Sequence, residues 1–347
     1  MAILNTLRPG VYSSYDVTSS YASARSGRYA AVAAKANGGV PGVLYVFSAL
    51  PEACEVFAPD TEGVFMRAIL KLLFDAGVSR VYCVSPEGDN YTAALAQTEE
   101  IENIGAVICD CKSSAGLLAL ARSLENASGN RRERIGFCGS DTVSAAMLDA
   151  QLLNAERVCL CCPAVGIETG ERSAVFAAAA LAGKILAAGD PAINLNGEAF
   201  PQLLPPGTMS ESEIQSLLSA GVTAFESCGG VCECVRAQST RTKTDGAPDR
   251  TFAGLNTIMI IDDVLMGLRN SLRTKLRGGK AGGVSAEAIH SQVMVELAAR
   301  RGEGLIESFS TPRCYASSGD PEVCVVELAF RVAHVVSQIA ITAHIRV

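Results

Sequence analysis

Short β-rich runs alternate with longer helical runs between residues 42 and 235 of this sequence, and this alternation constrains the fold more than any other feature. Strand-like runs occur at 43–47, 80–84, 106–109, 134–138 and 157–161. Helical runs lie at 61–74, 92–104, 114–124, 141–153 and 173–188, and Thr61 and Asp141 are the expected N-caps of two of them. A chain of this kind forms a mainly parallel or mixed sheet with helices on both faces. The first half therefore predicts an α/β domain.

The second half is organised differently. A connection rich in proline and glycine, 189–207, separates the two halves. Beyond it, Ser210 begins a short helix, and β runs at 222–225 and 231–235 flank two glycines, which predicts a hairpin. Two long helices and two closing strands follow, at 252–276, 285–301, 323–332 and 337–347. This order of elements predicts an α+β C-terminal domain.

The two ends of the chain have the character of extended arms. One end alternates apolar and polar residues up to the last position, with one face formed by Ile339, Ile341, Ile345 and Val347. The other end is a polar stretch without a core-forming period, which opens on Arg8, Pro9, Gly10, Val11 and Tyr12. Such ends suit strand addition to the sheet edge of a neighbouring subunit. The pattern fits pairing within the same chain equally well.

Composition excludes some classes of function. Of the 347 residues 49% are hydrophobic and 19% charged, and the mean hydropathy is +0.25. The longest apolar run, 174–188, contains Lys184 and is shorter than the roughly 20 residues of a membrane span. We also expect no signal peptide. The surplus apolar surface is expected in subunit contacts, and the net charge of -7 argues against a partner that is nucleic acid.

Thirteen cysteines in such a chain indicate a reducing compartment. Two clusters have spacings that invite a metal interpretation, and they consist of Cys159, Cys161 and Cys162 and of Cys228, Cys232 and Cys234. No histidine is near either cluster, and no second matching cysteine pair completes a ligand set. We therefore predict packed thiols and no metal site.

The α/β pattern also invites a catalytic interpretation. Residues 136–140 resemble a nucleophile elbow around Cys138 but lack the second glycine, and the three histidines lie in roughly the last sixty residues. No phosphate-binding glycine motif is present. Asp262 and Asp263 are adjacent on a helix, do not share a face, and are expected in surface or interface pairing. We predict no catalytic residue and no cofactor, with a small α/β enzyme carrying an oligomerisation domain as the alternative.

A cationic face is predicted on the first long helix. Arg269, Arg273 and Arg277 recur every four residues and share one side of the helix, with Lys275 and Lys280 nearby. No acid lies between residues 269 and 280. Two interpretations remain open: the cations complement the C-terminal end of the helix and face water, or they contact an acidic partner.

Several short motifs, taken in order, resemble the tail sheath proteins of contractile phage tails and phage-tail-like bacteriocins. The motifs occupy residues 8–12, 220–225, 229–231, 235–236, 239–242, 245–246, 249–252, 255–258, 262–263 and 339–347. The resemblance is good from residue 220 to the end and over the first dozen residues, and it is weak in the α/β region between them. No single motif is diagnostic of the family, and the resemblance rests on the order in which the motifs occur.

This resemblance implies a structural protein. Its subunits would stack as hexameric rings around an inner tail tube protein, exchange strands through their arms, and contract to drive the tube through a target envelope. Baseplate and tail-terminator proteins would be further partners, in a virion or phage-tail-like particle assembled in the bacterial cytoplasm. Another self-assembling tail component is the third possibility.

The resemblance also implies a division of the chain. Residues 1–28 would be an N-terminal arm and entry strand, 29–207 an inserted outer domain, 208–336 a tube-facing domain and 337–347 a C-terminal arm strand. The cationic face around Arg269, Arg273, Lys275, Arg277 and Lys280 would then be a possible tube contact.

Overall fold

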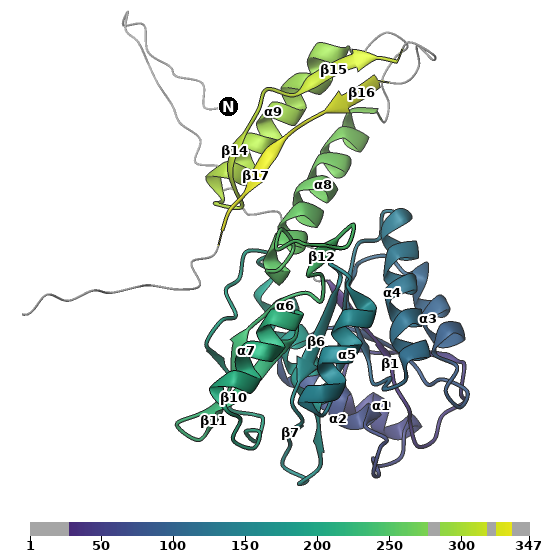
Figure 1. Cartoon of the computed structure of the whole chain (residues 1–347). Helices are drawn as coiled ribbons and strands as arrows, with labels where there is room; N and C mark the ends of the chain where they lie inside the picture. The colour runs from purple at the N-terminus through teal and green to yellow at the C-terminus, as the bar shows by residue number, and fades with distance from the viewer. Residues whose placement is uncertain (1–27, 277–284, 318–323, 335–347) are drawn as a thin grey trace, which may run out of the picture.

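The structure, a computed structural model, describes residues 28–276, 285–317 and 324–334. These residues form a large α/β body and a smaller helix–sheet unit that projects from it (Figure 1). The helix α8 (Leu255–Leu276) connects the two parts, because its first turns lie against the body and its later turns belong to the projecting unit.

A nine-stranded mixed sheet forms the centre of the body, in the order β2-β3-β1-β4-β5-β6-β10-β11-β9. The strands β3, β1, β4, β5, β6 and β10 are mutually parallel, and β2, β11 and β9 are added antiparallel to their neighbours. Their bounds are β1 Tyr29–Ala33, β2 Leu44–Phe47, β3 Val81–Val84, β4 Ile104–Cys109, β5 Ile135–Gly139, β6 Val158–Cys162, β9 Glu198–Ala199, β10 Thr223–Cys228 and β11 Val231–Arg236. The expected α/β class is confirmed.

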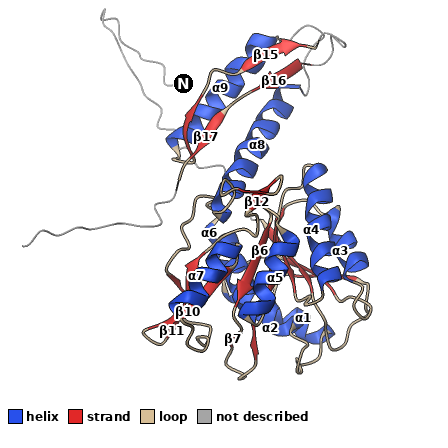
Figure 2. Ribbon diagram, in the orientation of Figure 1, coloured by secondary structure: helices blue, strands red, loops and turns tan. Residues whose placement is uncertain are grey.

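Helices cover both faces of this sheet (Figure 2). One face packs against α2 (Met66–Asp75) and α6 (Ala174–Ala188), with α1 (Leu50–Val56) beside them. The other face packs against α3 (Tyr91–Glu99), α4 (Ser114–Gly129), α5 (Val143–Leu153) and α7 (Glu211–Ala220). Alternation along β1 sends Ala30 and Val32 into the first layer and Ala31 and Ala33 into the second.

Small residues allow α6 to pack closely on the sheet. A Cβ atom added at Gly139, the last residue of β5, would lie 2.4 Å from the backbone carbon of Ala174 at the start of α6. Ala177, Ala178, Ala179 and Ala182 are fully buried along the helix. The short side chains therefore serve to bring helix and sheet backbones together.

The expected N-caps are partly wrong. α2 begins at Met66 and not at Thr61, because Asp60 accepts hydrogen bonds from the amides of Arg67 (3.0 Å) and Ala68 (2.7 Å). Thr142, not Asp141, caps α5.

Asp141 instead accepts a hydrogen bond of 2.7 Å from the amide of Ala174, so it satisfies the start of α6. Ser210 caps α7 as expected and forms a capping box with Glu213. The hairpin of β10 and β11 around Gly229 and Gly230 is also confirmed.

The projecting unit has its own core. α8 packs against α9 (Ala286–Gly302), and the core contains Ile260, Val264 and Leu268 of α8 and Ile289, Val293 and Leu297 of α9. Two two-stranded sheets complete it, formed by β14 (Ile306–Phe309) with β17 (Phe330–Val332) and by β15 (Arg313–Ala316) with β16 (Cys324–Glu327). Two small hairpins on the body are β7 (Val165–Gly166) with β8 (Arg172–Ser173) and β12 (Lys243–Thr244) with β13 (Ala247–Pro248).

The central sheet does not end at residue 207, where the α/β domain was expected to end. β10 and β11 lie beyond that residue and join the same sheet, with β10 paired to β6. In this structure the change of architecture therefore comes at α8, while the division into outer and tube-facing domains stays a prediction.

Candidate functional site

Arginine–carboxylate pairs connect α8 to the body. The guanidinium of Arg157, which directly precedes β6, donates two hydrogen bonds to Asp262 on α8, Nη1–Oδ2 of 2.5 Å and Nη2–Oδ1 of 2.8 Å. Only 15% of the Arg157 side chain and 2% of the Asp262 side chain are exposed. Burial alone would lower the pKa of Arg157, but the bonds to Asp262 outweigh it and raise this pKa. Burial raises the pKa of Asp262, and the hydrogen bonds and charge of Arg157 oppose this rise, so Arg157 is the partner most firmly held in its charged form.

A second pair lies further along the same helix. Arg269 contacts Glu133, two residues before β5, through Nη1–Oε1 and Nη2–Oε2 distances of 2.7 Å each. Burial opposes ionisation of Glu133, but the hydrogen bonds from Arg269 outweigh it and lower the pKa of Glu133. Two bidentate contacts, seven residues apart on α8, thus fix the angle of this helix to the sheet.

A third group of charges joins α8 to α9. Arg300 of α9 lies 3.0 Å from Asp263 and also contacts Glu296 (3.1 Å) and Glu303 (3.0 Å), while Arg28 approaches Asp263 at 4.0 Å. Asp262 and Asp263 are both buried and pair inside the chain. They were expected in surface or interface pairing; both do pair, but at buried positions within the chain, because the body covers Asp262 and α9 covers Asp263.

The predicted cationic face is only partly described. Arg269 is bound to Glu133, so it serves the junction, whereas Arg273 is exposed on α8. The side chain of Lys275, together with Arg277 and Lys280, lies outside the described residues. The tube contact stays a prediction, and within the described chain Arg273 is the cation available for it.

Both predicted arms, Arg8, Pro9, Gly10, Val11 and Tyr12 at one end and Ile339, Ile341, Ile345 and Val347 at the other, lie outside the described residues. The sheets of the projecting unit are described, and each is two-stranded in the described part of the chain. Their strands present backbone groups that a further strand can pair with. β14 and β15 were not predicted from the sequence, although the alternation of Ile306 with polar neighbours was a weak signal.

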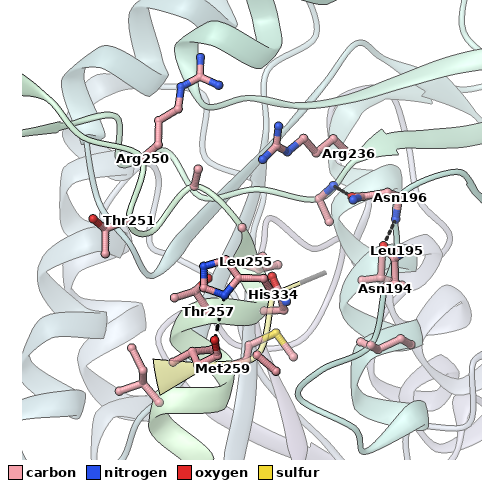
Figure 3. Close-up of a pocket in the computed structure, with 18 of the residues that line it drawn as sticks. Asn194, Leu195, Asn196, Arg236, Arg250, Thr251, Leu255, Thr257, Met259 and His334 are labelled. Atoms are coloured by element: carbon pink, nitrogen blue, oxygen red, sulfur yellow. Dashed lines mark hydrogen bonds between the residues drawn. The ribbon is translucent and has the colours of Figure 1, made fainter. Parts of the chain in front are cut away.

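A cavity of about 570 Å³ lies where the body, the start of α8 and the end of β17 meet (Figure 3). It is lined by three arginines, Arg236, Arg250 and Arg331, and by His334 and the polar residues Asn194, Asn196, Thr251, Asn256 and Thr257. No Asp or Glu occurs among the described residues that line it. This cavity was not predicted from the sequence, although Arg236 and Arg250 both lie in motifs that resemble the sheath family.

The catalytic and metal interpretations raised by the sequence centre on cysteines. Cys138 is fully buried, its thiol lies 3.9 Å from the carbonyl oxygen of Cys159, and burial raises its pKa well above the ordinary value. A buried thiol of this kind is a poor nucleophile. Over the described ranges, no group of three His, Cys, Asp or Glu residues has the arrangement of a metal site. Within the same ranges, no helix has the length and apolar character needed to cross a bilayer.

The fold defined by this body and its projecting unit is that of the sheath proteins of contractile tails and injection systems. In the baseplate structure of the anti-feeding prophage, one chain superposes with a TM-score of 0.72 at 13% identity, over 99% of this chain and 100% of that chain. A chain of the contracted helical sheath of the same prophage gives 0.68 at 12% identity, over 98% and 99%.

The sheath tail protein of Desulfitobacterium hafniense gives a TM-score of 0.68 at 10% identity, over 93% of this chain and 100% of that chain. No protein-family model and no curated protein sequence matches this chain. The likeness therefore lies in the fold, at sequence identities of 10–13%.

Proposed function

We propose that this chain is the structural subunit of a contractile sheath, which polymerises around an inner tube and contracts to drive that tube through a target envelope. The observation that carries the proposal is the match in fold over 98–99% of the chain to proteins whose structures are described as a contracted helical sheath and a tail baseplate. The order of motifs that resembles the sheath family supports the same conclusion independently. Such a subunit needs no catalytic centre and no cofactor.

Assembly would rest on the two arms. Residues 1–17 and 337–347 would leave their own subunit and add strands to the small sheets of neighbours, which offer open edges at β14, β15, β16 and β17 in the described chain. Main-chain hydrogen bonds in an added strand are independent of how the rest of each subunit is oriented. The links between subunits can therefore persist while the bodies rotate during contraction.

The junction charges suit this mechanism. The two bidentate pairs, Arg157 with Asp262 and Arg269 with Glu133, tie the projecting unit to the body. A subunit that moves as a rigid body transmits force between rings, whereas a hinged one would absorb it. We infer that the α/β body forms the outer part and that the unit from α8 to β17 faces the tube.

Negative-stain electron microscopy of the purified protein tests the proposal. We expect striated hollow cylinders, and we expect co-assembly with the inner tube protein of the same particle. An enzyme with an oligomerisation domain would give discrete closed oligomers, and a tube or baseplate protein would give narrow tubes or single rings. Either of those results would overturn the sheath assignment.

Deleting residues 339–347 tests the arm. The shortened protein is expected to remain folded and soluble and to form no cylinders. A matched control replaces Ile341 and Ile345 by valine, which keeps the apolar face and the β propensity. Cylinders formed by the deletion variant would contradict strand donation by this arm.

Reversal of charge tests the tube contact. Arg273→Glu together with Arg277→Glu is expected to abolish co-assembly with the tube while leaving Arg269 bound to Glu133. The control Arg122→Glu reverses an exposed charge on α4 of the body. Normal co-assembly of the double variant would leave the cations with the simpler role of complementing the C-terminal end of the helix.

A further inference from the structure

Two arginines in the cavity at the base of α8 have no counter-charge. Arg236 is the last residue of β11, and Arg250 lies in the loop before α8. Neither guanidinium makes a hydrogen bond or an ion pair with another residue in the described part of the chain. Burial, and then the charge of Arg250, lower the pKa of Arg236. The two positive charges therefore lie close enough to affect each other within the cavity.

The rest of the cavity wall adds to this positive field. The first turn of α8 begins at Leu255 inside the cavity, and the N-terminal end of a helix carries partial positive charge. Figure 3 shows Arg236 and Arg250 on one side of the cavity, with Thr257 and His334 opposite. The volume of about 570 Å³ is sufficient for several side chains. The chemistry that this site fits is a pair of carboxylates.

A pair of carboxylates of this kind occurs on the chain itself. Glu226 of β10 and Glu233 of β11 are direct cross-strand partners near the end of the hairpin. Like charges in this position destabilise a sheet. No cation forms an ion pair with either of them among the described residues. Their charges, with that of Glu233 the stronger, raise the pKa of the exposed thiol of Cys228 beside them.

The two features do not neutralise one another within one subunit. The hairpin end of β10 and β11 lies at the lower edge of the body in Figure 1, away from the base of α8. The charges of Glu226 and Glu233 do not contribute to the pKa shift of Arg236. Opposite charges that lie too far apart to pair within one subunit can pair across a contact between two subunits.

We propose that Glu226 and Glu233 of one copy of this chain dock into the cavity of a second copy and pair with its Arg236 and Arg250. The inference rests on the proposed function, because it concerns how sheath subunits contact one another. Two different surfaces meet in this contact, so it is heterologous and can continue from copy to copy, as a ring or helix requires. Two carboxylates match two guanidinium groups, and each contact is a charge-assisted hydrogen bond.

Charge exchange tests the contact by electron microscopy of cylinders. The variant with Arg236→Glu and Arg250→Glu brings four acids together, and the variant with Glu226→Arg and Glu233→Arg brings four cations together. Both are expected to lose cylinders while keeping the thermal unfolding midpoint of the wild type. The quadruple variant, which combines all four substitutions, restores opposite charges at every contact. It is expected to form cylinders again. Arg122→Glu, an exposed reversal on α4, is the matched control and should assemble normally.

A second measurement needs no variant. Cys228 lies beside the two glutamates, so docking should protect it, and its alkylation should be slower in wild-type cylinders than in dispersed subunits. Equal rates in the two states would overturn the proposal. So would normal assembly of either reversed variant, or failure of the quadruple variant to assemble when it is folded. Wild-type protein that forms no cylinders at all would instead contradict the sheath function itself.

Discussion

Arg157 and Asp262 are joined by two hydrogen bonds although 105 residues separate them in the sequence. One residue stands at the entry to a central strand, and the other lies on the helix that leads into the projecting unit. The contact therefore couples the two parts of the subunit at a buried point.

Asp262→Asn is expected to destabilise the protein by about 3 kcal/mol, because it removes the carboxylate that accepts two hydrogen bonds from the buried guanidinium of Arg157. Urea unfolding followed by circular dichroism measures this loss. The control is Asp75→Asn, which breaks an exposed pair with Lys71 and should cost less than about 0.5 kcal/mol. Equal effects of the two substitutions would show that the junction pair contributes no more than a surface pair.

The pair of Glu133 and Arg269 should make the junction sensitive to acid. The folded-state pKa of Glu133 is lowered, so its contribution is complete above the unfolded pKa of about 4.3 and is lost as the pH falls through the lower folded value. Glu133→Gln is expected to cost about 1.5 kcal/mol at pH 7 and much less at pH 3. Unfolding curves of the wild type and variant at both pH values test this. A difference that stays constant with pH would contradict it.

The sequence predicted the alternation of strands and helices well, because apolar periodicity and the helix start at Ser210 are local signals. It failed at β1, Tyr29–Ala33, where three alanines give no strand-like pattern. That strand is central because its small side chains fit between the helices on both faces of the sheet. Its position depends on packing with distant elements and not on its own propensity.

The site was harder to predict than the fold. The regular spacing of Arg269 and Arg273 was interpreted as one cationic face, but the partner of Arg269 is Glu133, 136 residues away. Arg236 and Arg250 lie in sequence motifs that gave no hint of a shared cavity. Contacts across such separations are set by the tertiary fold, so a pattern of local spacing does not reveal them.

Close packing of β5 on α6 leads to a third prediction. Gly139→Ala is expected to cost about 3 kcal/mol, because the added Cβ would lie 2.4 Å from backbone atoms that cannot move aside easily. Gly129→Ala is the matched control, since a Cβ atom added there would meet nothing within 4 Å and alanine favours the helix end where it sits. Thermal unfolding of both variants provides the comparison. A midpoint for Gly139→Ala equal to that of the wild type would show that β5 and α6 can separate freely.

Reactivity of the cysteines gives the last prediction. Burial raises the pKa of Cys162 and of Cys232 to about 12, so these thiols should resist alkylation in the folded protein. Cys228 is exposed, and the charge of Glu233 raises its pKa, so it should react first but more slowly than a free thiol.

Glu233→Gln removes that charge and should therefore speed alkylation of Cys228 severalfold at pH 8, where the thiolate fraction follows the pKa. Mass spectrometry of dispersed subunits treated with iodoacetamide measures the rate at each cysteine. Glu62→Gln, an exposed substitution on another loop, is the control and should change nothing. An unchanged rate at Cys228 in Glu233→Gln would mean that the carboxylate does not act on this thiol, which would also weaken the description of the hairpin end as an acidic surface.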